Sequence, residues 1–459
     1  MGEGLGEREE NKTANKKYAI ISAMEGALSP LDGRYASTVE PLRGFFSEEA
    51  LMRARVTVEV RYFLALAREP GVRELPKVNA RDTRELLRIA EKFSAQDAKR
   101  IKDIESVTRH DVKAVEYFLR EQFKKIASLR RSGEFLHFGL TSEDVNNLAY
   151  GLLIHAALKQ VLLPALKGLH GSLAKFGRSA LKVPMLSLTH GQPATPTTVG
   201  KEFLVFADRL DRQIAQLRAF KMQGKLGGAV GNFAAHKAAY PHVHWERFRA
   251  QFVKGLGLTP LTHTTQINPH DDIAELSHLF HRIDTILLDL CRDAWLYVSR
   301  GVFTQKVVAG EVGSSTMPHK VNPIDFENAE GNLGIANALF DHFASKLPIS
   351  RLQRDLSDST VQRNLGVAFG YHFLALRSIE RGMKKLTLDR AALKKELADH
   401  PEVIAEAIQT LLRKHGVPGG YEKLKALTRG EKVTRETFLR FIEGLPLSKE
   451  EKARLKGMA

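Results

Sequence analysis

The run IAELSHLFHRIDTILLDLCRDAW, residues Ile273–Trp295, gives the clearest indication of how this chain folds. Its apolar residues recur every three or four positions, which is the spacing of one face of an α-helix. The repeat continues for about five helical turns. Such a long helix with one apolar face predicts neighbouring helices of similar length, as in a helical bundle. The apolar stripe consists of Ile273, Leu276, Phe280, Ile283, Leu287 and Leu290.

Two other stretches show the same periodicity. Residues 148–169 predict a second long helix, in which Pro164 should cause a kink because proline has no backbone N–H. Residues 203–222 predict a third helix, and we find no series of alternating strands. The sequence therefore predicts a mainly α fold of three domains with a long central helical bundle. We expect a disordered tail at 1–28, an N-terminal helical domain at 29–130, the bundle at 131–383 and a small C-terminal helical domain at 384–459.

The composition limits the classes of protein to consider. Of 459 residues, 43% are hydrophobic and 27% are charged, as in an ordinary globular protein. The single cysteine, Cys291, excludes an internal disulfide framework, and we interpret it as a core residue of its helix. We see no apolar run long enough to cross a bilayer and no secretory signal, so we expect a cytoplasmic protein without a membrane partner.

The formal charge of +16 is compatible with two kinds of partner. Basic chains bind nucleic acids, but basic sites also attract small polyanionic substrates. The lysines and arginines are spread along the chain, and we find no nucleic-acid-binding motif. We therefore expect no nucleic-acid partner, although the charge by itself does not decide the question.

Three segments rich in Gly, Pro, Ser and Thr adjoin the predicted helices, at residues 138–147, 188–200 and 310–323. Loops on a rigid scaffold are where catalytic residues are often placed. The most informative string is GSSTMPHKVNP at 313–323. Small polar residues of this kind also occur in plain surface connectors, where they satisfy turn geometry. A flexible loop ending in Lys and Asn can instead close over a site and exclude water.

The string at 313–323 resembles the signature of the fumarase/aspartase superfamily, and the wider run 310–332 is similar to bacterial-type adenylosuccinate lyases. The resemblance extends from about Ser29 to Leu455. It implies a cofactor-free and metal-free β-elimination that releases fumarate from adenylosuccinate and from the succinylated aminoimidazole carboxamide ribotide (SAICAR). Further matching motifs are DGRY at 32–35, RHD at 109–111, TSED at 141–144, THGQP at 189–193, Gln266 and QRD at 353–355.

The resemblance implies five catalytic residues. Ser314 is the base that removes a proton next to a carboxylate, and it requires nearby donors because a hydroxyl is a poor base. His190 is the acid that protonates the departing nitrogen, since imidazole titrates near neutral pH, and Glu327 orients it. Lys320 stabilises the developing negative charge, and His110 assists on the leaving-group side.

The same resemblance implies the residues that bind the substrate. Hydroxyls and amides would hold the succinyl carboxylates, and arginines would hold the phosphate. Several of these residues also have a structural interpretation: Asp111 is expected to cap a helix with His110 exposed, and Thr141 and Ser142 are expected at another helix start. The implied set is Arg34, Tyr35, Arg109, Asp111, Thr141, Ser142, Thr189, Gln266, Ser315, Met317, Asn322, Arg354, Ser359 and Arg363.

The resemblance also implies a homotetramer in which each active site takes residues from three chains. Two alternatives remain. One is another lyase of the superfamily, such as an argininosuccinate lyase or an aspartase, and the other is a basic nucleic-acid-binding scaffold that has lost the chemistry. The chain stops at Ala459, earlier than the resemblance suggests, so we expect the last domain to lack its closing element.

Overall fold

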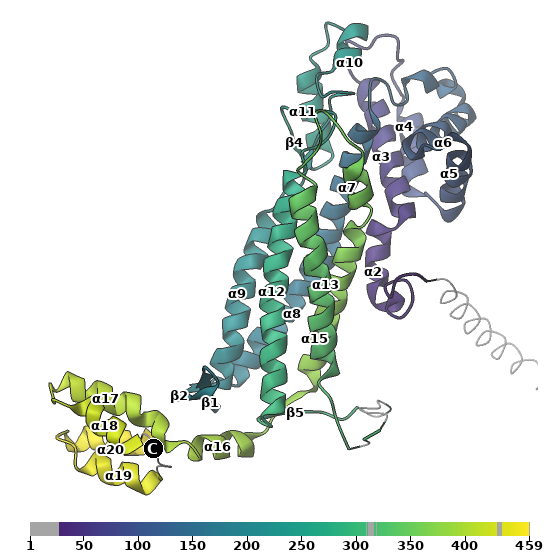
Figure 1. The fold of residues 1–459 in the computed structure, drawn as a ribbon. Helices are drawn as coiled ribbons and strands as arrows, with labels where there is room; N and C mark the ends of the chain where they lie inside the picture. Colours follow the sequence, from purple (N-terminus) through teal and green to yellow (C-terminus); the bar gives the residue numbers. More distant parts are fainter. Residues whose placement is uncertain (1–26, 309, 311–315, 318, 429–433, 459) are drawn as a thin grey trace, which may run out of the picture. The chain divides into compact units, whose positions relative to one another are not determined.

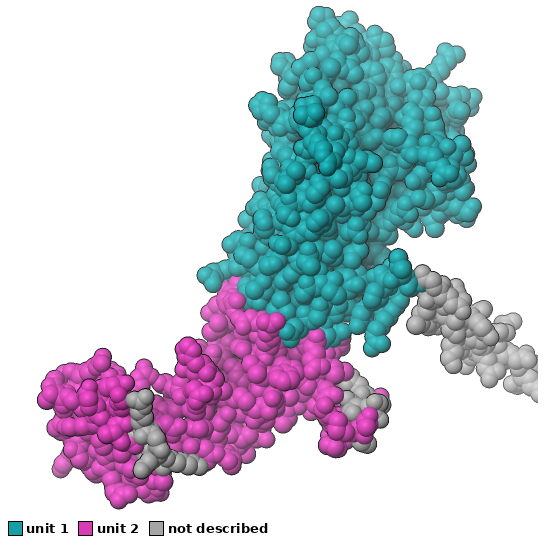
Figure 2. Space-filling model, in the orientation of Figure 1, with its two compact units in different colours: residues 1–168, 212–288, 328–378 teal, residues 169–211, 289–327, 379–459 magenta. Residues whose placement is uncertain are grey.

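The computed structural model describes residues 27–308, 310, 316–317, 319–428 and 434–458. Within these residues the chain is mainly helical, which confirms the expected fold class. The chain divides into two compact units (Figure 2). Unit 1 comprises residues 1–168, 212–288 and 328–378, and unit 2 comprises residues 169–211, 289–327 and 379–459. The three expected domain boundaries stay a prediction.

Figure 1 labels most of the helices and strands, which are numbered in chain order. The helices of the first half are α2 (Ala36–Phe46), α3 (Glu48–Leu66), α4 (Ala80–Glu91), α5 (Ala95–Thr108), α6 (Asp111–Lys125), η1 (Ala127–Leu129), η2 (Gly133–Phe135), α7 (Ser142–Ala157), η3 (Leu158–Leu162), α8 (Leu163–Ser179) and α9 (Val199–Ala219). Those of the second half are α10 (Ala234–Ala239), α11 (Trp245–Gly255), α12 (Asp271–Ser299), α13 (Ile324–Lys346), α14 (Ser357–Gln362), α15 (Leu365–Lys385), α16 (Arg390–Ala398), η4 (Pro401–Ile404), α17 (Ala405–Lys414), α18 (Gly420–Thr428), α19 (Arg435–Glu443) and α20 (Lys449–Met458). The strands form three two-stranded pairs: β1 (Pro184–Thr189) with β2 (Gln192–Thr198), β3 (Gln223–Gly224) with β4 (Thr259–Pro260), and β5 (Phe303–Gln305) with β6 (Leu386–Leu388).

The core of unit 1 lies where α12, α13 and α15 run side by side (Figure 1). Phe280, Phe340 and Phe369 come from these three helices and pack against one another, with ring centroids 5.1–5.4 Å apart. All three side chains are buried, so each contributes about 1.5–3 kcal/mol by leaving water. The stripe that begins at Ile273 thus faces a helical core, as its periodicity predicted.

The irregularity predicted at Pro164 takes the form of a π-helical turn, η3. Here the N–H of Leu163 donates to the carbonyl of Leu158, five residues earlier. Proline cannot donate to the helix and its ring crowds the preceding turn, so a widened turn just before it accommodates both defects.

The helical stretch Ser142–Ser179 is long and apolar enough to span a membrane by length and composition alone. The expectation that no run reaches that length was therefore wrong. A core helix of a bundle meets the same criterion, because it is apolar on most of its circumference. In this stretch 44% of the most apolar window is buried within the protein, and the carboxylates of Glu143 and Asp144 occupy its first turn.

Unit 2 contains two hydrophobic cores. Phe176 of α8, Phe203 of α9 and Phe303 of β5 pack together beside the β5–β6 pair. A separate cluster packs the helices after residue 400 together, and the expected domain at 384–459 stays a prediction. Its buried members are Ile404, Ile408, Leu412, Leu424, Phe438, Ile442, Leu445 and Leu455.

Two local expectations can be compared with the structure. Cys291 is buried in α12, as predicted. The segment 188–200, predicted as a loop, instead belongs mostly to the antiparallel hairpin β1–β2. The sequence does not indicate this hairpin, because it contains Pro193 and Pro196 and prolines are uncommon in paired strands.

Replacing Ile408 by alanine should destabilise the C-terminal cluster by about 2–5 kcal/mol, because it leaves a cavity at a fully buried position. Hydrogen exchange should then accelerate across α17 and α19 and stay unchanged in α7. Thr410→Ala, at an exposed position of the same helix, serves as the control. Equal protection in the two variants would show that this cluster does not hold the helices together.

Candidate active site

A cavity of about 560 Å³ in unit 1 brings together nine of the residues implied by the sequence. They come from four separate segments: the junction of α5 and α6, the start of α7, the loop before α12, and α14 with its flanks. These segments are distant in sequence, so only the fold makes them neighbours. The nine residues are Arg109, His110, Asp111, Thr141, Ser142, Gln266, Arg354, Ser359 and Arg363.

The starts of two helices form part of the cavity wall. The residue that caps α6 is His110, whose Nδ1 accepts from the N–H of Lys113 at 3.2 Å, so the expectation that Asp111 is the cap was wrong. The reason is the left-handed backbone of Arg109 (φ 55°), which ends α5 one residue earlier and leaves His110 extended. Thr141 caps α7, as predicted, and its N–H donates to Asp144 Oδ2 at 2.9 Å. Helix starts offer N–H groups that favour anions.

Asp111 lies between two guanidinium groups. Its Oδ2 accepts from Arg55 Nη2 at 2.7 Å and from Arg363 Nη2 at 3.1 Å, and its Oδ1 accepts from the N–H of Val112 at 2.9 Å. Burial alone would raise the pKa of Asp111, but the charge of Arg55, the Val112 hydrogen bond and Arg363 outweigh it and lower the pKa. Asp111 is therefore ionised at neutral pH and fixed from three sides.

Arg354, another arginine that lines the cavity, is also held by acidic and polar groups. Its Nη1 lies 3.5 Å from Glu143 Oε2, and its Nη2 donates to Ser359 Oγ at 3.2 Å. A second carboxylate, on Asp358, lies 3.9 Å from Nη2. Gln266 is placed by its side-chain amide, which donates to the carbonyl of Ala229 at 2.7 Å. Both predicted residues thus have defined positions in the cavity wall.

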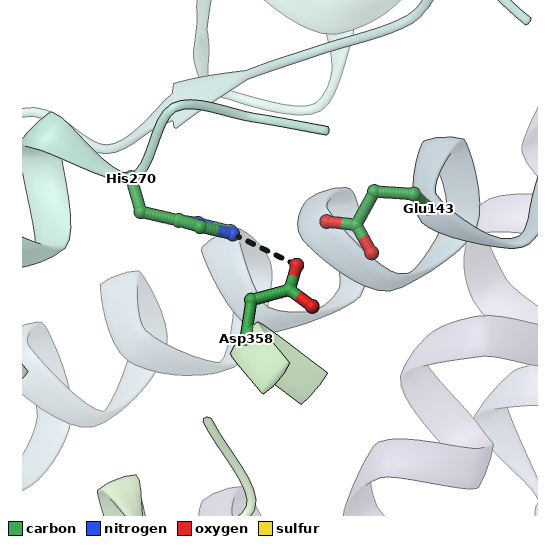
Figure 3. Close-up of side chains that lie close together, drawn as sticks. All are labelled: Glu143, His270 and Asp358. Carbon is green, nitrogen blue, oxygen red and sulfur yellow. Dashed lines mark ion pairs between the residues drawn. The ribbon is translucent and has the colours of Figure 1, made fainter. Parts of the chain in front are cut away.

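Behind Arg354 lies a buried cluster of Glu143, His270 and Asp358 (Figure 3). His270 Nε2 is 3.6 Å from Asp358 Oδ2 and 2.9 Å from Gln362 Nε2. Burial raises the pKa of Glu143 to about 7, against the opposing charge of His270. The pKa of Asp358 is lowered, because contacts with His270 and Arg354 outweigh the effect of burial. The pKa values of the two carboxylates in this buried cluster are therefore shifted in opposite directions.

The cluster has the residue types of a metal site, since its three ligand atoms lie within 4.8 Å of one another. The contacts of these three residues with Arg354 and Gln362 indicate a different role. Arg354 supplies positive charge to both carboxylates, and Gln362 contacts the His270 ring. We interpret the cluster as the support of Arg354, and the absence of a metal stays a prediction.

Asp144 anchors the start of α7. It pairs with Lys225 at 2.7 Å, and both side chains are fully buried. The same carboxylate accepts from the N–H groups of Gly227 and Gly228 at 2.9 and 3.0 Å. Buried ion pairs are stable only when their remaining hydrogen-bonding positions are filled, and here they are. This pair fixes the residues just before it, Thr141 to Glu143.

The other predicted residues lie elsewhere in the chain. Arg34 and Tyr35 belong to unit 1 but do not line this cavity in the part of the chain that the structure describes. The Tyr35 hydroxyl accepts from Asn328 Nδ2 at 3.0 Å, and the Arg34 guanidinium lies 5.8 Å from the Tyr35 ring. The role of Arg34 and Tyr35 in binding the substrate therefore stays a prediction.

Thr189 and His190 lie at the tip of the β1–β2 hairpin in unit 2. The connection is His190-Gly191, with φ values of 54° and 73°, which is the geometry of a tight two-residue turn. Both residues before Gly191 are exposed at this tip. The turn thus presents His190 to solvent within its own chain.

The remaining predicted residues also belong to unit 2. Met317 and Lys320 are exposed, and Asn322 is half-buried. Glu327, in the first turn of α13, accepts from Trp295 Nε1 at 3.0 Å. The predicted contact between Glu327 and His190 stays a prediction. Ser314 and Ser315 lie outside the described residues.

Sequence reasoning missed four residues that shape the cavity: Arg55, Glu143, His270 and Asp358. Glu143 and Asp358 adjoin predicted residues, so their acidic character next to Ser142 and Ser359 was an available signal. Arg55 and Glu59 stand four apart on α3 and are both buried. A buried charge on an otherwise apolar helix face usually has a partner, but the sequence does not indicate which one.

The fold and this cavity define a class of protein. A family model described as lyase matches residues 33–336, and one described as adenylosuccinate lyase C-terminal matches residues 350–459. Solved structures of a 3-carboxy-cis,cis-muconate lactonizing enzyme from Pseudomonas putida and a fumarate lyase from Mesorhizobium sp. BNC1 share the fold. Their TM-scores are 0.72 and 0.71, at 21% and 18% identity, over 90% and 91% of this chain and 92% and 94% of theirs. The chain is thus a lyase.

Its relatives narrow the class further. Adenylosuccinate lyase of Escherichia coli (strain K12) is 52% identical over 432 residues, which is 94% of this chain and 95% of that protein. The adenylosuccinate lyases of Legionella pneumophila (strain Corby) and Dictyostelium discoideum are 50% and 49% identical, each over 94% of both chains. The chain belongs to the adenylosuccinate lyase family.

The cluster behind Arg354 predicts a pH dependence of stability. The pKa of Glu143 is about 7 in the folded chain and 4.5 ordinarily, so folding favours its protonated form. Its contribution to stability is full below pH 4.5 and is lost as the pH rises through about 7. Glu143→Gln cannot ionise, so its stability relative to wild type should rise by up to about 3 kcal/mol between pH 5 and pH 8.

Thermal unfolding of both proteins at the two pH values measures this effect. The exposed Glu91→Gln is the control and should show no such change. A constant difference between wild type and Glu143→Gln across this range would mean that Glu143 ionises normally.

Proposed function

We propose that the chain catalyses the cofactor-free β-elimination of fumarate from adenylosuccinate, giving AMP, and from SAICAR, giving the aminoimidazole carboxamide ribotide, in purine nucleotide biosynthesis. The observation that carries this proposal is the cavity of unit 1. Its predicted residues include three arginines, three hydroxyl groups and a histidine from four distant segments. Such a set suits a ligand with carboxylates and a phosphate. The family relationship over 94% of the chain is our reason for choosing adenylosuccinate as the substrate.

We assign the catalytic steps to the residues that the family resemblance implies. Ser314, as an alkoxide, removes the proton from the carbon next to a succinyl carboxylate, and the electron pair left behind forms the C=C bond of fumarate. The C–N bond breaks, and the departing nitrogen takes its proton from His190. Lys320, with Asn322, stabilises the negative charge that gathers on the carboxylate before the bond breaks. Glu327 holds the His190 ring in one tautomer.

We assign the binding residues to different groups of the substrate. Thr141 and Ser142 stand at the start of α7, where backbone N–H groups and hydroxyls suit the succinyl carboxylates, and Gln266 adds an amide beside them. Arg354 and Arg363 suit the phosphate, because guanidinium groups bind phosphate oxygens in pairs. His110 is exposed at the cavity, and we assign it to the leaving-group side of the substrate. Arg34, Tyr35, Arg109, Asp111, Thr189, Ser315, Met317 and Ser359 complete the proposed set.

We further propose that the enzyme is a cytoplasmic homotetramer with shared active sites and no nucleic-acid or membrane partner. Among the described residues, those lining the cavity all belong to unit 1, whereas His190, Lys320 and Glu327 belong to unit 2. Different copies of the chain can supply the two sets, and a symmetric assembly would then repeat each site.

The proposed reaction is tested by incubating the purified protein with adenylosuccinate, without added metal or cofactor, and measuring fumarate and AMP. We expect the two products in equal amounts. Argininosuccinate and aspartate, assayed in parallel, test the other lyases of the superfamily. Fumarate from either of these alone would reject the nucleotide substrate, and no product from any substrate would reject the catalytic role.

The shared site is tested by mixing two inactive variants, Ser314→Ala and His110→Ala. Each alone should lose at least about 100-fold in kcat, since one lacks the base and the other lacks the histidine that assists departure of the leaving group. When subunits are exchanged in equal amounts, about one quarter of the sites regain both residues if the two come from different copies. Recovery of activity to that level is expected. If mixing recovers nothing although the subunits exchange, both residues of a site belong to one chain.

A further inference from the structure

Arg55 of α3 is a buried cation that the proposed mechanism does not use. Its side chain is only 5% exposed, although an arginine is rarely buried without a specific partner. Its Nη2 donates to Asp111 Oδ2 at 2.7 Å and its Nε donates to Asn146 Oδ1 at 2.8 Å. Arg55 thus connects α3 to the first turns of α6 and α7, the two helices whose starts line the cavity.

The Asp111 oxygen that Arg55 contacts also accepts a hydrogen bond from Arg363. Asp111 Oδ2 also accepts from Arg363 Nη2 at 3.1 Å, and the Arg363 side chain is 57% exposed. The three residues therefore carry two positive charges and one negative charge. Because Asp111 is already neutralised by the buried Arg55, the charge of Arg363 remains available to an incoming anion. Without Arg55, Asp111 would neutralise Arg363 instead.

The same three residues form a partition in unit 1. Arg55, Asp111 and Arg363 line both the candidate active cavity and a second cavity of about 410 Å³. The second cavity has an apolar wall that includes Phe46, Met52 and other side chains of α2, α3 and α7. The Asp111–Arg363 contact thus lies where the two spaces adjoin, and Arg55 fixes that contact from the protein interior.

We infer that Arg55 is a positioning residue: through Asp111 it orients Arg363 and keeps its positive charge available for the anionic substrate. This inference rests on the proposed function. Arg55 does not touch the reacting atoms, so it should affect substrate binding far more than the chemical step. The lowered pKa of Asp111, to which Arg55 contributes, agrees with this arrangement.

The test compares Arg55→Gln and Arg55→Lys with wild type in steady-state cleavage of adenylosuccinate. Glutamine keeps a hydrogen-bonding side chain but removes the charge, so KM should rise about 10- to 100-fold while kcat changes less than about threefold. Lysine restores the charge and should recover most of the loss in KM. A residue with only a structural role would not show this rescue together with an unchanged kcat.

Arg249→Lys is the matched control. Arg249 is a buried arginine of α11 whose Nη1 donates to the carbonyl of Thr262 at 2.8 Å, and it lines neither cavity. Its replacement should leave KM within about twofold of wild type, since Arg249 contacts Thr262 and Phe233 rather than Asp111. An equal rise in KM in this control would show that any disturbed buried arginine has the same effect, and would overturn the inference.

A double variant covers the case in which Arg55→Gln does not fold. Arg55→Gln with Asp111→Asn leaves no unpaired buried charge. If Arg55 acts only through Asp111, the KM of the double variant should lie within about threefold of Asp111→Asn alone, and a further tenfold rise would overturn the inference. An unchanged KM in folded Arg55→Gln would also overturn it while leaving the proposed function intact. If wild type releases no fumarate, both fall together.

Discussion

The buried ion pair between Asp144 and Lys225 is the interaction on which the candidate site depends. Neither side chain contacts solvent, so the pair is tolerated only because backbone groups saturate it. Asp144 accepts from the N–H groups of Thr141, Gly227 and Gly228, and Asn147 exchanges two hydrogen bonds with the backbone of Lys225. The start of α7 is thereby tied to a segment about 80 residues later in the chain. The succinyl-binding residues we propose precede this anchor directly.

Two of the arginines that line the cavity, Arg354 and Arg363, are held in the same way. Each is held by a carboxylate at the start of another helix, Asp111 for Arg363 and Glu143 for Arg354. Behind each carboxylate lies a further buried group, Arg55 in one case and the His270–Asp358 pair in the other. Long arginine side chains lose much conformational freedom when they bind a ligand, and a pre-formed support reduces that cost. The net charge of +16 therefore matters less than the few charges that are held in place.

The helices could be predicted because their apolar stripes are long, and the candidate residues could be predicted because their motifs are specific. What failed depends on backbone geometry or on distant partners. His110 rather than Asp111 caps α6 because Arg109 has a left-handed backbone. An arginine in the sequence does not indicate that conformation. Arg55 went unnoticed because its partner Asp111 is 56 residues away. The motif at Ser314 was visible from sequence alone, and it stays a prediction.

The positive φ values of Arg109, His190 and His270 show how this chain balances folding against activity. In that backbone region a residue with a Cβ costs about 1 kcal/mol more than glycine, so each of these positions is conformationally strained. Glycine would relieve the strain but would remove a guanidinium or an imidazole at, or next to, the proposed site. The protein thus gives up thermodynamic stability at three points to keep particular side chains. All three positions lie in connections between helices or strands, so this strain falls outside the long helices.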